Sequence, residues 1–166
     1  MIRARQGDIA AFERLAERHM TDLYRLATAL VGAADARDLT QETLVAAWRE
    51  LPRLRDPERF LPWLRRIAVN RCRNHLRSRS RHPAENLLEA VPSGRSELAD
   101  ADRRLDMADA LGVLPVGQRA VVVLHYLVGL PLREVAETLG VPEGTAKSRL
   151  NAALTTLRNE LAEVPA

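Results

Sequence analysis

Apolar residues recur every three or four positions along most of this chain, a spacing that predicts helices rather than strands. In the first such stretch Asp8 is suited to cap the N-terminus of a helix, and Gly32 is suited to end it. The apolar positions between them are Ile9, Phe12, Leu15, Ala16, Met20, Leu23, Ala27 and Leu30. We therefore predict a first long helix between these two residues.

A second predicted helix, from about Asp35 to about Leu51, is apolar on two sides. Leu39, Thr43, Ala46 and Ala47 form one side, and Leu44 and Trp48 lie almost opposite. The narrow polar stripe that remains consists of Asp38, Gln41, Glu42 and Arg49, with Val45 inside it. Such a helix is often the central helix of a small bundle. An acidic stripe edged by apolar groups is equally typical of a docking face for a partner protein, and the pattern alone favours neither interpretation.

Pro52 is expected to stop that helix, and Asp56 and Pro57 are suited to be the N-cap and first residue of a short helix. A long basic helix is then predicted from Pro62 to about residue 81. Its packing side is made of Leu64, Ile67, Ala68, Cys72, His75 and Leu76. Its other side carries Arg66, Asn70, Arg73 and Arg77, whose guanidinium and amide donors suit phosphate oxygens and base edges. Taken alone, such a basic side is more often solvated surface than a nucleic-acid site.

The helical pattern is lost from Ser80 to about Ser96, where Pro, Gly, Ser and acidic residues predict a linker. It returns from Leu98 to Leu114. The next segment, RAVVVLHYLVG at 119–129, has the β-branched composition of a buried strand. We favour a helix there, because no second strand is predicted that could pair with it.

The C-terminal segment 132–157 has the pattern of a helix-turn-helix. Pro131 and Pro142 are suited to open its two helices, Gly140 permits a left-handed turn, and small Ala136 allows the helices to cross closely. On the second helix Ala146, Leu150, Ala153, Leu154, Leu157 and Leu161 are expected to face inward, and Gly144, Ser148, Asn151, Ala152 and Thr155 outward. Thr145, Lys147 and Arg149 flank that outward face, so the helix resembles one that reads the major groove of DNA.

Charge is distributed unevenly along the 166 residues, although the net charge is only +3. Residues 1–82 hold 17 Arg against 10 acidic residues, 83–114 hold 3 against 7, and 115–166 hold 5 Lys and Arg against 5 acids. The first part is therefore the one suited to a polyanion.

Other function classes find little support in the sequence. Cys72 is the only cysteine and sits among apolar positions, which favours a buried thiol over a disulfide or metal ligand. The four histidines lack ligand spacing, and we find no nucleophile with a base beside it and no phosphate-binding loop. We expect neither catalysis nor a cofactor or metal. No apolar run is long enough to span a membrane, and we expect a cytoplasmic protein.

Four segments in this order resemble an extracytoplasmic-function (ECF) sigma factor of the bacterial sigma-70 superfamily. The start of region 2 is similar to residues 7–32, and its polymerase-docking helix is similar to residues 38–51. The segment that reads the minus-10 element is similar to WLRRIAVN at 63–70. Region 4 is similar to residues 114–150. The resemblance implies an all-α fold of two small helical domains. We expect region 2 at 1–80, a flexible linker at 81–97, and region 4 with its helix-turn-helix at 98–166.

The resemblance also implies partners and residue roles. Core RNA polymerase would be bound through its β′ clamp helices and β flap, with Asp38, Gln41, Glu42 and Val45 on the docking face. The turn containing Leu54, Arg55 and Arg59 would form with Asn70 a pocket for a base flipped out of the minus-10 element. Nearby phosphates would be held by Arg66, Arg73 and Arg77, and the minus-35 element by Glu143, Gly144, Thr145, Lys147, Ser148 and Arg149. An anti-sigma factor is a further possible partner.

The chain departs from many relatives at Val69 and at Asn151 and Ala152, where those relatives carry basic residues at or near the matching positions. We therefore expect weak minus-35 binding that depends on tethering by the polymerase. Two alternatives remain: a stand-alone helix-turn-helix regulator, and a sigma-like mimic that sequesters an anti-sigma factor without touching DNA.

Overall fold

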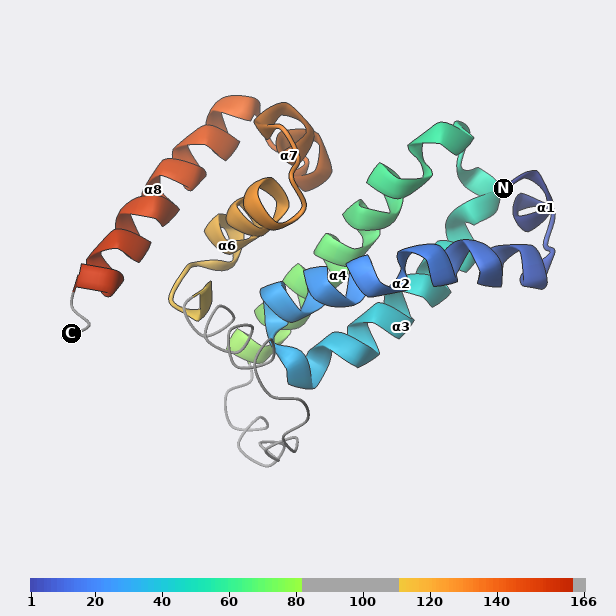
Figure 1. Ribbon diagram of the computed structural model, residues 1–166, viewed down its shortest axis with the longest axis horizontal. Helices are drawn as coiled ribbons and strands as arrows, with labels where there is room; N and C mark the ends of the chain where they lie inside the picture. Colours follow the sequence, from blue (N-terminus) through green and yellow to red (C-terminus); the bar gives the residue numbers. More distant parts are fainter. Residues whose placement is uncertain (82–110, 163–166) are drawn as a thin grey trace.

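The computed structural model describes residues 1–81 and 111–162, and every regular element in these ranges is helical. The all-α prediction is confirmed. The N-terminal part contains α1 (Ile2–Arg5), α2 (Ile9–Val31), α3 (Ala33–Glu50) and α4 (Phe60–Arg81). The C-terminal part contains α6 (Val116–Val122), α7 (Leu132–Leu139) and α8 (Glu143–Ala162) (Figure 1). The linker predicted at 81–97 and most of the helix predicted from Leu98 to Leu114 lie outside the described residues.

The N-terminal bundle is built from α2, α3 and α4, which pack pairwise against one another. Asp8 caps α2 as predicted, because its Oδ1 accepts a hydrogen bond from the Ala11 amide at 2.9 Å. Gly32 ends α2 with a positive φ of 90° and passes the chain directly into α3. The side chains that are almost fully enclosed at the centre include Leu26, Leu30, Leu51, Leu64 and Val69.

Two short 3-10 turns connect α3 to α4. The first, η1 (Leu51–Arg53), carries Pro52, and the second, η2 (Pro57–Arg59), is capped by Asp56, which accepts a hydrogen bond from the Glu58 amide at 3.0 Å. The predicted cap at Asp56 is therefore present. The basic helix begins at Phe60 rather than at Pro62, and the proline occupies its first turn, where it has no intrahelical hydrogen bond to lose.

The β-branched segment after Arg119 is helical, as we favoured. It continues α6 into one turn of π-helix, η4 (Val123–Leu127), in which the Val128 amide reaches back to the Val123 carbonyl at 3.1 Å. Val121, Val123 and Leu124 are buried, so the apolar run supplies core side chains of the C-terminal part. The periodicity of the sequence gives no sign of the extra residue that a π turn inserts.

The helix-turn-helix pairs α7 with α8 around Gly140, which adopts the left-handed conformation with φ 64° and ψ 40°. The Val141 amide closes the corner by donating to the Ala136 carbonyl at 3.0 Å. Ala136, Ala146, Leu150 and Ala153 are all buried at the crossing. The predicted inward face is thus confirmed over the described side chains.

Replacing Gly140 with alanine is expected to lower the free energy of unfolding by about 1 kcal/mol, because alanine is strained at this φ. An added Cβ would meet no neighbouring atom within 4 Å, so backbone strain is the whole effect. Gly144→Ala on the exposed side of α8 is the control and should leave stability unchanged or slightly raised. Chemical denaturation of the two variants measures the difference, and equal midpoints would contradict the prediction.

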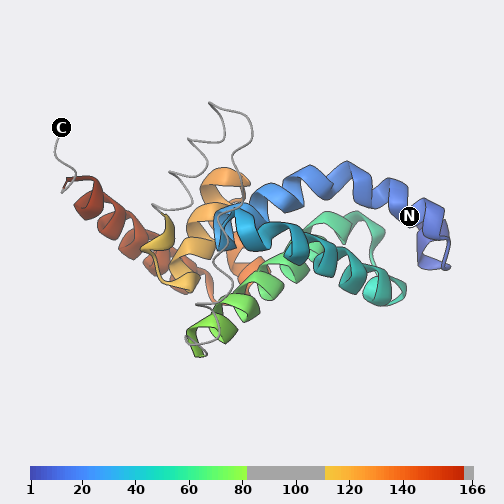
Figure 2. The same cartoon turned by 90° about the horizontal axis from the view of Figure 1, so that it is seen from below.

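The N-terminal unit, made of α1 to α4, and the C-terminal unit, made of α6 to α8, lie against each other. α7 packs on α4, while η4 and α6 approach the C-terminal half of α2 (Figures 1 and 2). α1 and the far end of α8 lie at opposite ends of the molecule. The surfaces that carry the predicted functions are therefore not all free in this arrangement.

Candidate nucleic-acid interface

The outward face of α4 is only partly exposed. Arg66, Asn70 and Arg77 are exposed, as predicted. Arg73 is instead half-buried, and its Nη1 donates to the Leu139 carbonyl at the end of α7 at 3.4 Å. Burial lowers the pKa of Arg73, and the positive charges of Arg77 and Arg149 lower it further.

The opposite face of α4 holds the helix in the bundle. Leu64, Ala68 and Cys72 are buried as predicted, and Val69 is completely buried beside them. Burial raises the pKa of the Cys72 thiol to about 12, which keeps it protonated and unreactive. Because Val69 faces the core, the residue before Asn70 contributes packing rather than charge to this helix.

The turn before α4 presents two arginines. Arg55 and Arg59 are exposed, while Leu54 is buried and anchors the turn to the core. Asn70 lies ten residues beyond Phe60, which corresponds to about 15 Å of helical rise. The pocket predicted between this turn and Asn70 stays a prediction.

The polar stripe of α3 is open to solvent. Asp38, Gln41 and Glu42 are exposed, and the side chain between them, Val45, is 49% exposed. Glu42 forms an ion pair with Arg71 of α4 at 3.4 Å. The opposite side of α3 is buried through Leu39, Thr43 and Ala47. α3 is thus both the central helix of the bundle and the carrier of an exposed acidic stripe, so the two interpretations of its sequence are compatible.

α8 presents the outward face predicted for a major-groove helix. Gly144, Ser148, Asn151, Ala152 and Thr155 are exposed, together with Glu143 and Lys147. Thr145 is half-buried and accepts a hydrogen bond from the Ser148 hydroxyl at 3.0 Å through its carbonyl. Arg149 is also half-buried, since its guanidinium lies beside Gly117 at the start of α6.

The described residues contain no cluster of three His, Cys, Asp or Glu side chains that could hold a metal ion. His19 is half-buried, its ring lies 5.8 Å from that of Phe60, and burial lowers its pKa, as suits a boundary histidine. Within the described residues, no helix is both long and apolar enough to cross a membrane.

Sequence reasoning missed Arg119, whose guanidinium lies between the two units and donates to three backbone carbonyls of the described residues. In the sequence it is a single arginine at the start of an apolar run. Its contacts depend on the folded positions of the two units, which no local pattern specifies.

Family models match both units. The model of Sigma-70 region 2 matches residues 15–82, and that of Sigma-70, region 4 matches residues 104–157. The ECF RNA polymerase sigma-E factor of Haemophilus influenzae is 30% identical, over 96% of this chain and 92% of that protein. The ECF RNA polymerase sigma factor SigM of Mycobacterium tuberculosis is 37% identical, over 86% of this chain and 73% of its own length.

Two solved structures of complexes contain a chain with this fold. RpoE of Bartonella quintana in complex with the anti-sigma factor NepR has a TM-score of 0.76 at 25% identity, over 95% of this chain and all of that one. CnrH in complex with the cytosolic domain of CnrY has a TM-score of 0.73 at 30% identity, over 98% and 96% of the two chains. With both regions matched in order and relatives aligned along nearly the whole chain, this protein belongs to the ECF branch of the sigma-70 family and is an RNA polymerase sigma factor.

Proposed function

We propose that this sigma factor docks on core RNA polymerase through the acidic stripe of α3 and opens the minus-10 element on α4. In this proposal Asp38, Gln41, Glu42 and Val45 form the docking face, and the outward face of α8 reads the minus-35 element. The protein itself is non-catalytic and acts in the cytoplasm, and the nucleotide chemistry belongs to the polymerase. An anti-sigma factor is a further partner that we propose from the similar complex of RpoE with the anti-sigma factor NepR.

The observation that carries the proposal is the exposed amide of Asn70 in the middle of the arginine row of α4. Phosphate contacts from Arg66 and Arg77 position a strand without reading it, whereas an amide can bond a base edge. About 15 Å of helical rise separates Asn70 from Phe60 at the start of α4, a length that spans roughly four stacked nucleotides at 3.4 Å each. We therefore propose that a single strand runs along this face, with Asn70 and the turn holding an unstacked base and Arg66, Arg73 and Arg77 holding phosphates.

Run-off transcription with reconstituted holoenzyme tests the function directly. The chain is combined with core polymerase and a library of promoter fragments, and core polymerase alone is the control. We expect specific transcripts that require the chain. Their absence, with the chain bound to core polymerase, would favour the alternative of a sigma-like mimic.

A gel shift with and without core polymerase separates the proposal from a stand-alone regulator. The described part of α7 and α8 carries few basic side chains, and counterion release from DNA is correspondingly small. We expect the free chain to bind a promoter much more weakly than the holoenzyme does. Equal affinity of the two would favour the stand-alone regulator.

Replacing Arg73 with alanine is expected to weaken holoenzyme binding to most promoters and to make the salt dependence shallower. Loss of one phosphate contact reduces the slope of log K against log salt by about 1. Arg14→Ala, which removes an exposed arginine of α2, is the matched control. Filter binding at several salt concentrations measures both slopes, and an unchanged Arg73→Ala slope would remove this residue from the proposed strand path.

A further inference from the structure

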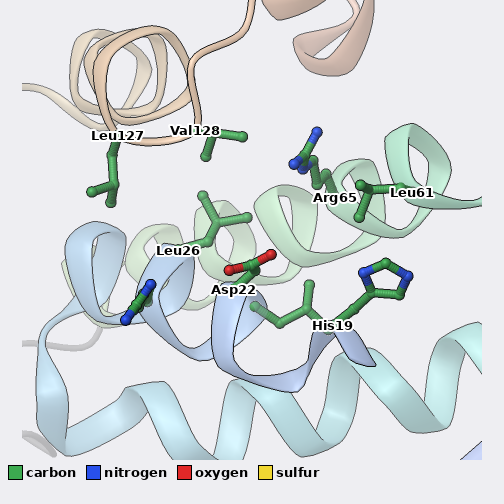
Figure 3. A pocket seen from close by; sticks show the side chains of 9 residues that line it. His19, Asp22, Leu26, Leu61, Arg65, Leu127 and Val128 are labelled. Atoms are coloured by element: carbon green, nitrogen blue, oxygen red, sulfur yellow. The ribbon is translucent and has the colours of Figure 1, made fainter. Parts of the chain in front are cut away.

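A cavity of about 160 Å³ lies where three segments of the chain meet (Figure 3). Its walls come from α2, from the first turns of α4, and from the end of η4 with the residue that follows it. The volume is well above the share of one water molecule, roughly 30 Å³, so the cavity has room for a small organic molecule. It shares no residue with the proposed docking face of α3 or with the residues of α4 and α8 that we propose for DNA.

Side chains of opposite charge line this cavity without contacting each other. The carboxylate of Asp22 and the guanidinium of Arg65 are both part of its wall, and Arg25 adds a second, exposed guanidinium. Burial lowers the pKa of Arg65, and the carboxylates of Asp22 and Glu134 partly oppose this shift. Glu134, on α7, does not line the cavity. Among the described residues, neither an ion pair nor a hydrogen bond joins Asp22 to Arg65.

The two charged groups are suited to the two ends of one small molecule. Arg65 is half-buried, and no described residue accepts a hydrogen bond from its guanidinium. A guanidinium carries five N–H donors in a planar fork, which matches the two oxygens of a carboxylate. The carboxylate of Asp22 only accepts hydrogen bonds, which suits an ammonium group. A molecule between them is therefore best held if it carries a negative and a positive group close together.

Much of the remaining wall is aliphatic. Leu127 and Val128 face Leu26 across the cavity, and Leu61 lies one turn before Arg65 on α4 (Figure 3). Leu127 is 46% exposed, so an apolar group placed against it would remove apolar surface from water. Aliphatic walls disfavour an inorganic ion such as phosphate, because they cannot replace its hydration. The lining therefore favours a charged molecule that also carries an aliphatic group.

Each simpler class of ligand meets an unfavourable group in this cavity. Asp22 repels a simple anion, and Arg25 and Arg65 repel a simple cation. A neutral apolar molecule leaves these charged groups without partners. We propose that the cavity binds a free α-amino acid with an aliphatic side chain, with its carboxylate on Arg65, its ammonium on Asp22 and its side chain against Leu26 and Leu127. This small-molecule site is independent of the docking and DNA-binding roles proposed above.

Isothermal titration calorimetry of the full-length chain with L-leucine tests the site. Isocaproate is leucine without its ammonium group, and isoamylamine is leucine without its carboxylate, so the two are matched probes. We expect leucine to bind with a Kd of roughly 1 mM or below. Each probe should bind at least about tenfold more weakly, because it lacks one hydrogen-bonded charge. Isocaproate that binds as tightly as leucine would overturn the role of Asp22, and absence of leucine binding would overturn the site.

Two substitutions locate the bound molecule. Asp22→Asn should weaken leucine binding at least about tenfold and remove its advantage over isocaproate, whereas Arg65→Gln should weaken the binding of both. Glu17→Gln and Arg14→Gln are the controls, because they neutralise exposed charges of α2 that do not line the cavity, and they should change neither affinity. Asp22 is exposed, so its variant keeps the test decisive if Arg65→Gln fails to fold by circular dichroism. Leucine binding that is unchanged in the folded variants would overturn this site.

Discussion

Replacing Asn70 with alanine should slow promoter melting about tenfold while leaving initial promoter binding nearly unchanged. The amide is the one carboxamide in the row of Arg66, Asn70, Arg73 and Arg77, and a good bidentate contact to a base edge is worth about 1–3 kcal/mol. Losing such a contact in the transition state for strand opening slows that step by roughly a factor of ten per 1.4 kcal/mol. Initial binding depends on phosphate contacts from Arg66 and Arg77, which remain.

Permanganate reactivity of minus-10 thymines, followed over time after holoenzyme is mixed with promoter, measures the melting rate. Asn74→Ala is the matched control, because it removes the same exposed amide one turn further along α4. Both positions are exposed, so neither variant should change the free energy of unfolding by more than about 0.5 kcal/mol. Wild-type melting by Asn70→Ala would show that the unstacked base is held elsewhere on this face.

Much of this fold could be predicted because its determinants are local. Asp8 and Asp56 cap helices where an acceptor side chain precedes an apolar period, and Gly140 occupies a left-handed turn that other residues adopt only with strain. The period of three and four likewise places Leu64 and Cys72 inside and Arg66 outside. Each of these features depends on residues within a few positions of one another.

The features that could not be predicted depend on packing between distant segments. By periodicity alone, Val69 falls at the edge of the apolar side of α4. It is fully buried, because α4 packs against helices of both the N-terminal and the C-terminal unit. Arg73 belongs to the arginine row by spacing, yet α7 covers it. The contact between Arg119 and Leu30 joins residues 89 positions apart. A sequence pattern predicts the face on which a side chain lies, and tertiary packing decides whether that face remains free.

Reversing the charge of Asp38 is expected to weaken binding to core polymerase at least about 30-fold. Asp38 lies on the exposed acidic stripe of α3, beside Gln41 and the apolar Val45 that we propose for the centre of the docking face. The few hot-spot residues of an interface contribute about 2 kcal/mol or more each, and an arginine at Asp38 would also meet the basic surface that an acidic stripe is suited to bind. Glu42 is less suitable for the test, because its reversal would also break the ion pair with Arg71.

Fluorescence anisotropy of labelled chain titrated with core polymerase measures the affinity of Asp38→Arg. Glu50→Arg is the control, because it makes the same change of charge at an exposed position of α3 outside the stripe. If the docking face is correct, only Asp38→Arg loses affinity, and it also loses run-off transcription at limiting polymerase. Equal losses in the two variants would mean that the polymerase senses the overall charge of the domain rather than this stripe.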